Sequence, residues 1–215
     1  LNSNDYQITF NNNFILYLIG IFYNFFIPGG FGGDAYKFYL MKKNYKWDFK
    51  KLFKLLVFDR LIGLGALVCI LFFMIQNFIL DLNLIYIIIS LLLTLALGYY
   101  IVKYLFNNQH IYFKSLGISI INQLLQFLTI FFVILSLGIE NNFVEIIIVF
   151  ICSSILSVFS IGGIGIREYI FLISASFINF SPELSASVGL LFTFSASFST
   201  IPGLVYLISK PKFLK

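Results

Sequence analysis

Four apolar segments, each long enough to cross a lipid bilayer, restrict the fold of this chain more than any other feature of its sequence. They cover residues 52–75, 84–102, 116–137 and 184–208. A helix needs about 20 apolar residues to cross the hydrocarbon core. Charged residues form 11% of the chain, whereas a soluble domain averages about 25%. The sequence therefore predicts an all-α, polytopic membrane helical bundle.

Two further apolar regions are each interrupted by glycines and divide into short halves. Residues 14–27 pair with residues 34–40, and residues 144–160 pair with residues 165–178. The breaks contain Gly29, Gly30, Gly32 and Gly33 in the first region, and Gly162, Gly163 and Gly165 in the second. Inside a bilayer, unpaired backbone groups are tolerated only within protein or beside water. We therefore expect two broken, re-entrant helix hairpins.

The two glycine motifs are copies of each other, 133 positions apart. This offset lays residues 29–36 over residues 162–169, with Asp34 facing Arg167. It also lays the long span after the first hairpin over the long span after the second. We predict an internal repeat, with units at about residues 14–75 and 144–208, inside one membrane domain covering residues 1–215. The chain does not begin with Met and its first residues lack a signal-peptide pattern, so we expect a fragment without its upstream spans.

The positions of the lysines predict the orientation of the spans. Short cytoplasmic loops are enriched in Lys and Arg. Residues 41–54 contain six lysines, Lys103 and Lys114 flank the next loop of this kind, and three lysines end the chain. The loops near Asp81 and Glu140 contain neither Lys nor Arg. We expect the C-terminus inside and the two hairpins entering from opposite faces, an inverted repeat like those of many transporters.

Only two arginines occur, and each lies beside an acidic residue in apolar surroundings, as Asp59-Arg60 and Arg167-Glu168. A guanidinium group stays charged and offers a planar fork that suits carboxylate or phosphate. One interpretation is that these charges neutralise one another, for example Asp34 with Arg60 or with Arg167. The other is that they bind an anionic ligand, since intramembrane charges are usually functional.

The glycines also have two interpretations. They either let helices approach closely or end one half-helix and start the next, leaving backbone N–H groups for an anion. Their near-contiguous clustering favours the second.

The lysines lie at the ends of apolar segments, which indicates a membrane surface and not nucleic acid. Cys69 and Cys152 show no disulfide or zinc spacing, and we expect no metal and no cofactor.

Four motifs in order resemble the flippase-like membrane domain of lysylphosphatidylglycerol synthases and their stand-alone relatives. They are residues 28–34 (PGGFGGD), 59–64 (DRLIGL), 162–168 (GGIGIRE) and 201–203 (IPG). The resemblance covers nearly the whole chain, although Lys37 stands where we expect an arginine. It implies a protein of the cytoplasmic membrane that moves a phospholipid or lipid-linked sugar between leaflets.

The leading hypothesis is therefore a lipid translocase that has a membrane lipid as its partner. The alternatives are the membrane portion of a lipid aminoacyl or glycosyl transferase, and a non-transporting assembly factor. No catalytic motif occurs in the chain, and the sequence is compatible with a homo-oligomer. The residues expected at the lipid headgroup are Gly29, Gly30, Gly32, Gly33, Asp34, Lys37, Asp59, Arg60, Gly162, Gly163, Gly165, Arg167 and Glu168.

Overall fold

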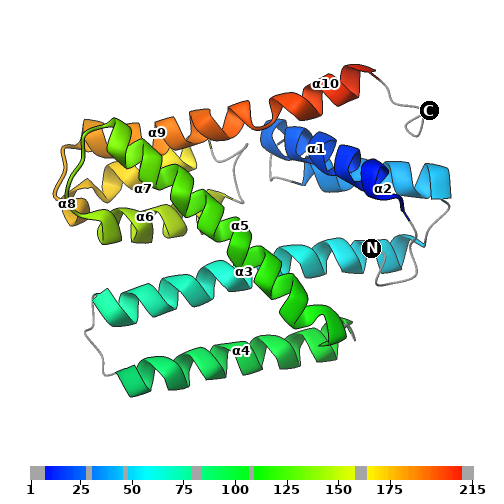
Figure 1. The fold of residues 1–215 in the computed structure, drawn as a ribbon, viewed down its shortest axis with the longest axis horizontal. Coiled ribbons are helices and arrows are strands. Elements are labelled where there is room, and N and C mark those ends of the chain that lie inside the picture. The colour runs from blue at the N-terminus through cyan, green and yellow to red at the C-terminus, as the bar shows by residue number, and fades with distance from the viewer. Residues whose placement is uncertain are drawn as a thin grey trace.

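Helices make up almost all of the computed structural model, which describes residues 8–27, 31–45, 48–78, 84–106, 109–157 and 164–209. Within these ranges there are ten helices and no β-strand, which confirms the predicted all-α membrane bundle. Figure 1 shows the long helix α5 running diagonally across the molecule, with short helices on either side of it.

The long helices correspond to the four predicted spans. They are α3 (Phe49–Phe78), α4 (Leu84–Phe106), α5 (Gln109–Ser136) and the pair α9 (Pro182–Phe198) and α10 (Ile201–Ser209). By length and composition, Leu52–Gln76, Tyr112–Ser136 and Pro182–Ser209 can each cross a membrane. Helix α4 has 23 residues, and its described apolar stretch is Leu92–Tyr104. The chain is thus a membrane protein.

The two interrupted regions form pairs of short helices. The first pair is α1 (Phe10–Phe26) and α2 (Gly32–Tyr45). The second is α6 (Phe143–Leu156) followed by α7 (Ile166–Ile173) and the single turn α8 (Ala175–Ile178). In each pair the second helix packs back against the first. In the view of Figure 1, the C-terminal end of α1 and the N-terminal end of α7 both lie toward the middle of the molecule.

The helix boundaries follow the sequence offset of 133. Helices α1 and α3 begin at Phe10 and Phe49, and α6 and α9 begin 133 positions later, at Phe143 and Pro182. Gly32 begins α2, and its counterpart Gly165 is the N-cap residue of α7. These helix starts share the offset of the sequence motifs, whereas the repeat units and their inverted orientation in the membrane stay predictions.

The last predicted span is divided into two helices by a short turn. Helix α9 ends at Phe198, and α10 begins after a turn at residues 199–200. Pro202 is the second residue of α10, where the N–H that proline lacks has no helical partner in any case. The carbonyl of Ser197 accepts both the N–H and the hydroxyl of Thr200, at 3.0 and 2.7 Å, so it stays hydrogen-bonded at the break.

The largest core cluster holds the second helix pair in place. It joins α5, α6, α7, α8 and α9 through buried apolar side chains that include Ile134, Phe150, Phe171, Val188 and Phe192. Helix α10 instead packs on α1. A Cβ atom on Gly203 would overlap the backbone carbonyl of Leu18, so the two helices touch through their main chains.

Candidate functional site

The first arginine lies in an ion pair that joins α2 to α3. Arg60 Nε donates to Asp34 Oδ2 at 2.5 Å. The guanidinium also lies over the ring of Phe31, 4.5 Å from its centroid. Lys37 Nζ is 3.8 Å from the other oxygen of Asp34. The side chains of Asp34 and Arg60 are only 16% and 28% exposed, so the pair is more strongly coupled than an ordinary surface pair.

The position of Asp34 depends on the close crossing of α1 and α2. A Cβ atom on Gly33 would overlap the backbone of Gly20, so only glycine permits this approach. Asn24 Oδ1 accepts the N–H of Gly33 at 2.8 Å and thereby satisfies a free donor at the start of α2. Asp34 follows in the first turn, where the helix dipole favours a carboxylate.

The second arginine is buried and lacks a carboxylate partner in the described part of the chain. Arg167 is 7% exposed and lies near the start of α7. Its Nη1 donates to Thr193 Oγ1 at 3.0 Å, and that hydroxyl donates to the carbonyl of Gly189. The guanidinium lies over the ring of Phe192, 4.6 Å from its centroid. Its Nε has no hydrogen-bond partner among the described residues.

These two contacts occupy equivalent positions in the repeat. Asp34 and Arg60 are 26 positions apart, as are Arg167 and Thr193. The repeat offset of 133 positions relates Asp34 to Arg167 and Arg60 to Thr193. The arginine lies on the long helix in the first unit and on the short helix in the second. Each contact therefore ties the short helix to the following long one, but only the first is an ion pair.

Two cavities of similar size flank the Asp34–Arg60 pair. The larger, which we call the lysine cavity, has a volume of about 410 Å³ and lies between α1, α2, α3 and α5. Its polar lining residues are Asn13, Tyr17, Lys37, Asp59, Lys114 and Ser115. The arginine cavity, about 400 Å³, is lined by Asp34, Arg60 and six apolar residues. Leu56 lines both cavities, whereas Arg167 lines neither.

The remaining residues expected at the headgroup have varied positions. Gly29, Gly30, Gly162 and Gly163 lie outside the described residues. Gly165 adopts a φ of 85°, a conformation that favours glycine. Its N–H donates to Glu168 Oε2 at 2.6 Å, so Glu168 caps its own helix. Of the two other acidic residues expected at the headgroup, Glu168 makes this cap and Asp59 lines the lysine cavity.

Sequence reasoning did not place three of the residues in this region. Thr193 contacts Arg167, Lys114 lines the lysine cavity, and Asn24 caps α2. The offset of 133 contained the signal for Thr193, because it is the counterpart of Arg60. No comparable signal identified Lys114 or Asn24.

The chemistry available at these positions is recognition of charge, chiefly by guanidinium, ammonium and carboxylate groups. Among the described residues, no cluster of three or more His, Cys, Asp or Glu side chains could hold a metal ion. Both cavities combine charged groups with apolar walls. Such walls suit a ligand that has a charged end and an apolar body.

Comparison with known families gives one match. The family model described as "Lysylphosphatidylglycerol synthase TM region" matches residues 1–116 and 103–203. Together these matches cover most of the chain, including both arginine contacts and both cavities. No curated protein and no solved structure matches the chain.

Proposed function

Because this chain belongs to the lysylphosphatidylglycerol synthase transmembrane family, we propose that it is a lipid translocase. It would move a lipid with a phosphate-bearing headgroup between the leaflets of the cytoplasmic membrane. Arg60, Arg167 and backbone N–H groups of the glycine motifs would hold the phosphate while the acyl chains stay in the hydrocarbon region. The N–H groups of Gly33 and Gly165 are not among them, because they donate to Asn24 and Glu168. In this proposal the C-terminus lies inside the cell.

The buried guanidinium of Arg167 is the observation that carries the proposal. A buried charge without a charged partner is costly. Arg167 has one hydrogen bond to a neutral hydroxyl, an aromatic ring beneath it and an unused Nε donor within the described region. A phosphate would supply both the missing charge and an acceptor. Membrane lipids bring phosphate together with an apolar body, which suits a site within a helix bundle.

The geometry of the broken helix pairs supports the same proposal. The end of α1 and the start of α7 point toward the middle of the molecule (Figure 1). Transporters built from inverted repeats place their substrate between such discontinuous helices. Of these two ends, the N-terminal end of α7 carries the partial positive charge that favours a phosphate, without the cost of burying another full charge.

A transport assay in vesicles tests the proposal. The protein is reconstituted with a fluorescent phosphatidylglycerol, and the fraction in each leaflet is followed by quenching the outer leaflet with a membrane-impermeant reductant. We expect wild-type protein to equilibrate the probe and Arg167→Gln to lose most of this activity. Lys103→Gln, at the exposed end of α4, serves as the matched control. Full activity in both Arg167→Gln and Arg60→Gln would contradict the proposed role of the arginines.

The topology has its own test. Single cysteines are placed in the loops at residues 46–48 and 138–142 and labelled with a membrane-impermeant reagent. We expect labelling from opposite sides of the membrane. Labelling from the same side would rule out the inverted repeat, because the two broken pairs would then enter from the same face.

A further inference from the structure

We propose that the lysine cavity is a loading site for the headgroup of a singly charged phosphodiester lipid. Lys37 and Lys114 would contact the phosphate, and Asp59 would limit the charge that the site accepts. This inference rests on the proposed lipid translocase, but it concerns a different site from the two arginine contacts. It also selects one of the two substrate classes that the sequence left open, a phospholipid over a pyrophosphate-linked carrier.

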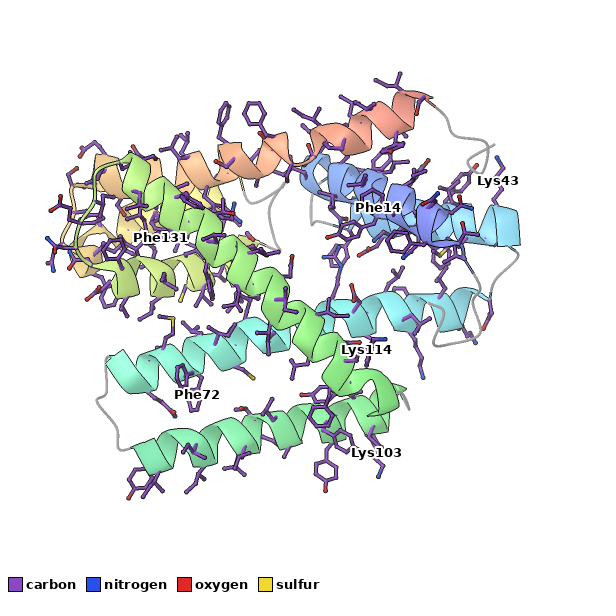
Figure 2. The ribbon with its side chains drawn as sticks, in the orientation of Figure 1. Phe14, Lys43, Phe72, Lys103, Lys114 and Phe131 are labelled. Atoms are coloured by element: carbon purple, nitrogen blue, oxygen red, sulfur yellow. The ribbon has the colours of Figure 1, made fainter. Side chains whose placement is uncertain are left out.

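The charged groups of the cavity come from three separate helices. Lys37 lies on α2, Asp59 on α3 and Lys114 on α5. Figure 2 shows Lys114 near the N-terminal end of α5, and Phe14, another lining residue, on α1. Because α5 lies outside both repeat units, the site cannot be built from the repeat alone. Tertiary packing brings the two ammonium groups to one cavity.

These three groups form no close ion pair with one another among the described residues. In the part of the chain that the structure describes, neither Asp59 nor Lys114 takes part in an ion pair. Lys37 is 3.8 Å from Asp34, at the outer limit for an ion pair, and its ammonium lies 5.7 Å from the centre of the Tyr17 ring. Lys37, Lys114 and Asp59 thus line one cavity, in which the two lysines could bind a charged ligand.

The charge balance of the cavity selects the headgroup. Two lysines and one aspartate leave one net positive charge. A phosphodiester carries one negative charge, so its binding leaves the site neutral. A pyrophosphate carries at least two, and Asp59 would repel the excess. The charged composition therefore favours a glycerophospholipid over a pyrophosphate-linked carrier.

The apolar part of the cavity suits the acyl chains and leads toward the arginine site. Phe10, Phe14, Leu55 and Ile118 are among its apolar lining residues. Leu56 also lines the arginine cavity, which contains the Asp34–Arg60 pair. A headgroup bound at the lysines would therefore be one side chain away from Arg60. Lys37 and Lys114 also lie near the loops predicted to face the cytoplasm, so the cavity would load from the inner leaflet.

Direct binding in detergent tests the site without requiring transport. Purified full-length protein is titrated by calorimetry with dihexanoyl phosphatidylglycerol, with farnesyl pyrophosphate and with inorganic phosphate. We expect wild-type protein to prefer the phosphatidylglycerol. Lys114→Gln should weaken its binding roughly tenfold, the effect of losing one charge-assisted hydrogen bond. Lys114→Arg should restore most of the affinity, and Lys103→Gln, on α4 (Figure 2), should bind like wild type.

Asp59→Asn gives a result that misfolding cannot imitate. Removing the carboxylate raises the net charge of the cavity to two, so binding of farnesyl pyrophosphate should strengthen. Wild-type affinity for phosphatidylglycerol in Lys114→Gln would overturn the inference. Equal binding of inorganic phosphate would also overturn it, because the site would then be a simple anion site. Binding that follows these expectations in a protein that moves no lipid would support the site and refute the proposed translocase. If Lys114→Gln transports lipid normally and binds it like wild type, the translocase would be supported and the lysine site refuted.

Discussion

Replacing Gly33 with alanine should weaken the packing of α1 against α2 and displace the carboxylate that pairs with Arg60. The new Cβ would overlap the carbonyl oxygen, carbonyl carbon and Cα of Gly20. These are backbone atoms, so no side chain can rotate to relieve the overlap. One helix must move instead, and Asp34 moves with α2 because it is the next residue.

The expected loss of stability follows from this geometry. Forcing one extra carbon into a packed interface costs about 1–3 kcal/mol. Gly63→Ala on α3 is the matched control, because a Cβ atom there would meet nothing within 4 Å. In that open helical position alanine should be neutral or stabilising by up to about 1 kcal/mol. The two variants add the same methyl group, so they should differ by about 2 kcal/mol or more.

Unfolding titrations in mixed micelles, followed by circular dichroism, give the comparison. Gly33→Ala should unfold at a lower denaturant fraction than wild type, and Gly63→Ala at the same or a higher fraction. Equal stability of the two variants would refute the close backbone crossing of α1 and α2. The position of Asp34 would then need another explanation.

The same titrations test three further contacts. A double-mutant cycle of Asp34→Asn and Arg60→Gln should give a coupling energy of about 1–3 kcal/mol, and additive effects would exclude the ion pair. Thr193→Val should destabilise the protein by about 1–3 kcal/mol because it removes the hydroxyl acceptor of a buried guanidinium. Arg167→Leu should leave stability unchanged or raised while abolishing lipid transport, and lost stability would make Arg167 a structural residue. Gly203→Ala should cost about 1–3 kcal/mol because its methyl group meets the backbone of α1.

The helix pairs could be predicted because they depend on local chemistry. Glycine clusters interrupt apolar segments, and the two interrupted regions predicted at residues 14–40 and 144–178 form α1 with α2 and α6 with α7 and α8. Helix α2 begins earlier than predicted, at Gly32, so Gly32 and Gly33 lie within it. The break before Pro202 also has a local cause, since proline cannot continue the hydrogen bonds of a helix. Both kinds of break are caused by glycine or proline at or next to the break, so they can be predicted from the local sequence.

The partners of the charged residues depend on how helices cross, and this was harder to predict. Asp34 with Arg60 was one of two pairings that charge alone allowed. Thr193 was missed because a hydroxyl on an apolar helix usually bonds to its own backbone, and here it does so as well as binding Arg167. Lys114 was interpreted from its loop as a topology signal, whereas the packing of α5 on α3 brings it to a cavity.

Equivalent positions of the two repeat units form the contacts Asp34–Arg60 and Arg167–Thr193, but only the first is an ion pair. In the first unit a carboxylate neutralises Arg60, so a phosphate must displace Asp34 to bind there. In the second unit the counterpart of Arg60 is Thr193, and Arg167 forms no ion pair with any residue that the structure describes. A headgroup loaded in the lysine cavity would meet the Asp34–Arg60 pair next, because Leu56 lines both cavities. In the proposed mechanism this difference lets the first contact act as a barrier and makes the second the stronger anion site. The double variant Asp34→Thr/Thr193→Asp moves the carboxylate from Arg60 to Arg167. Transport by this variant should therefore require Arg60 in place of Arg167.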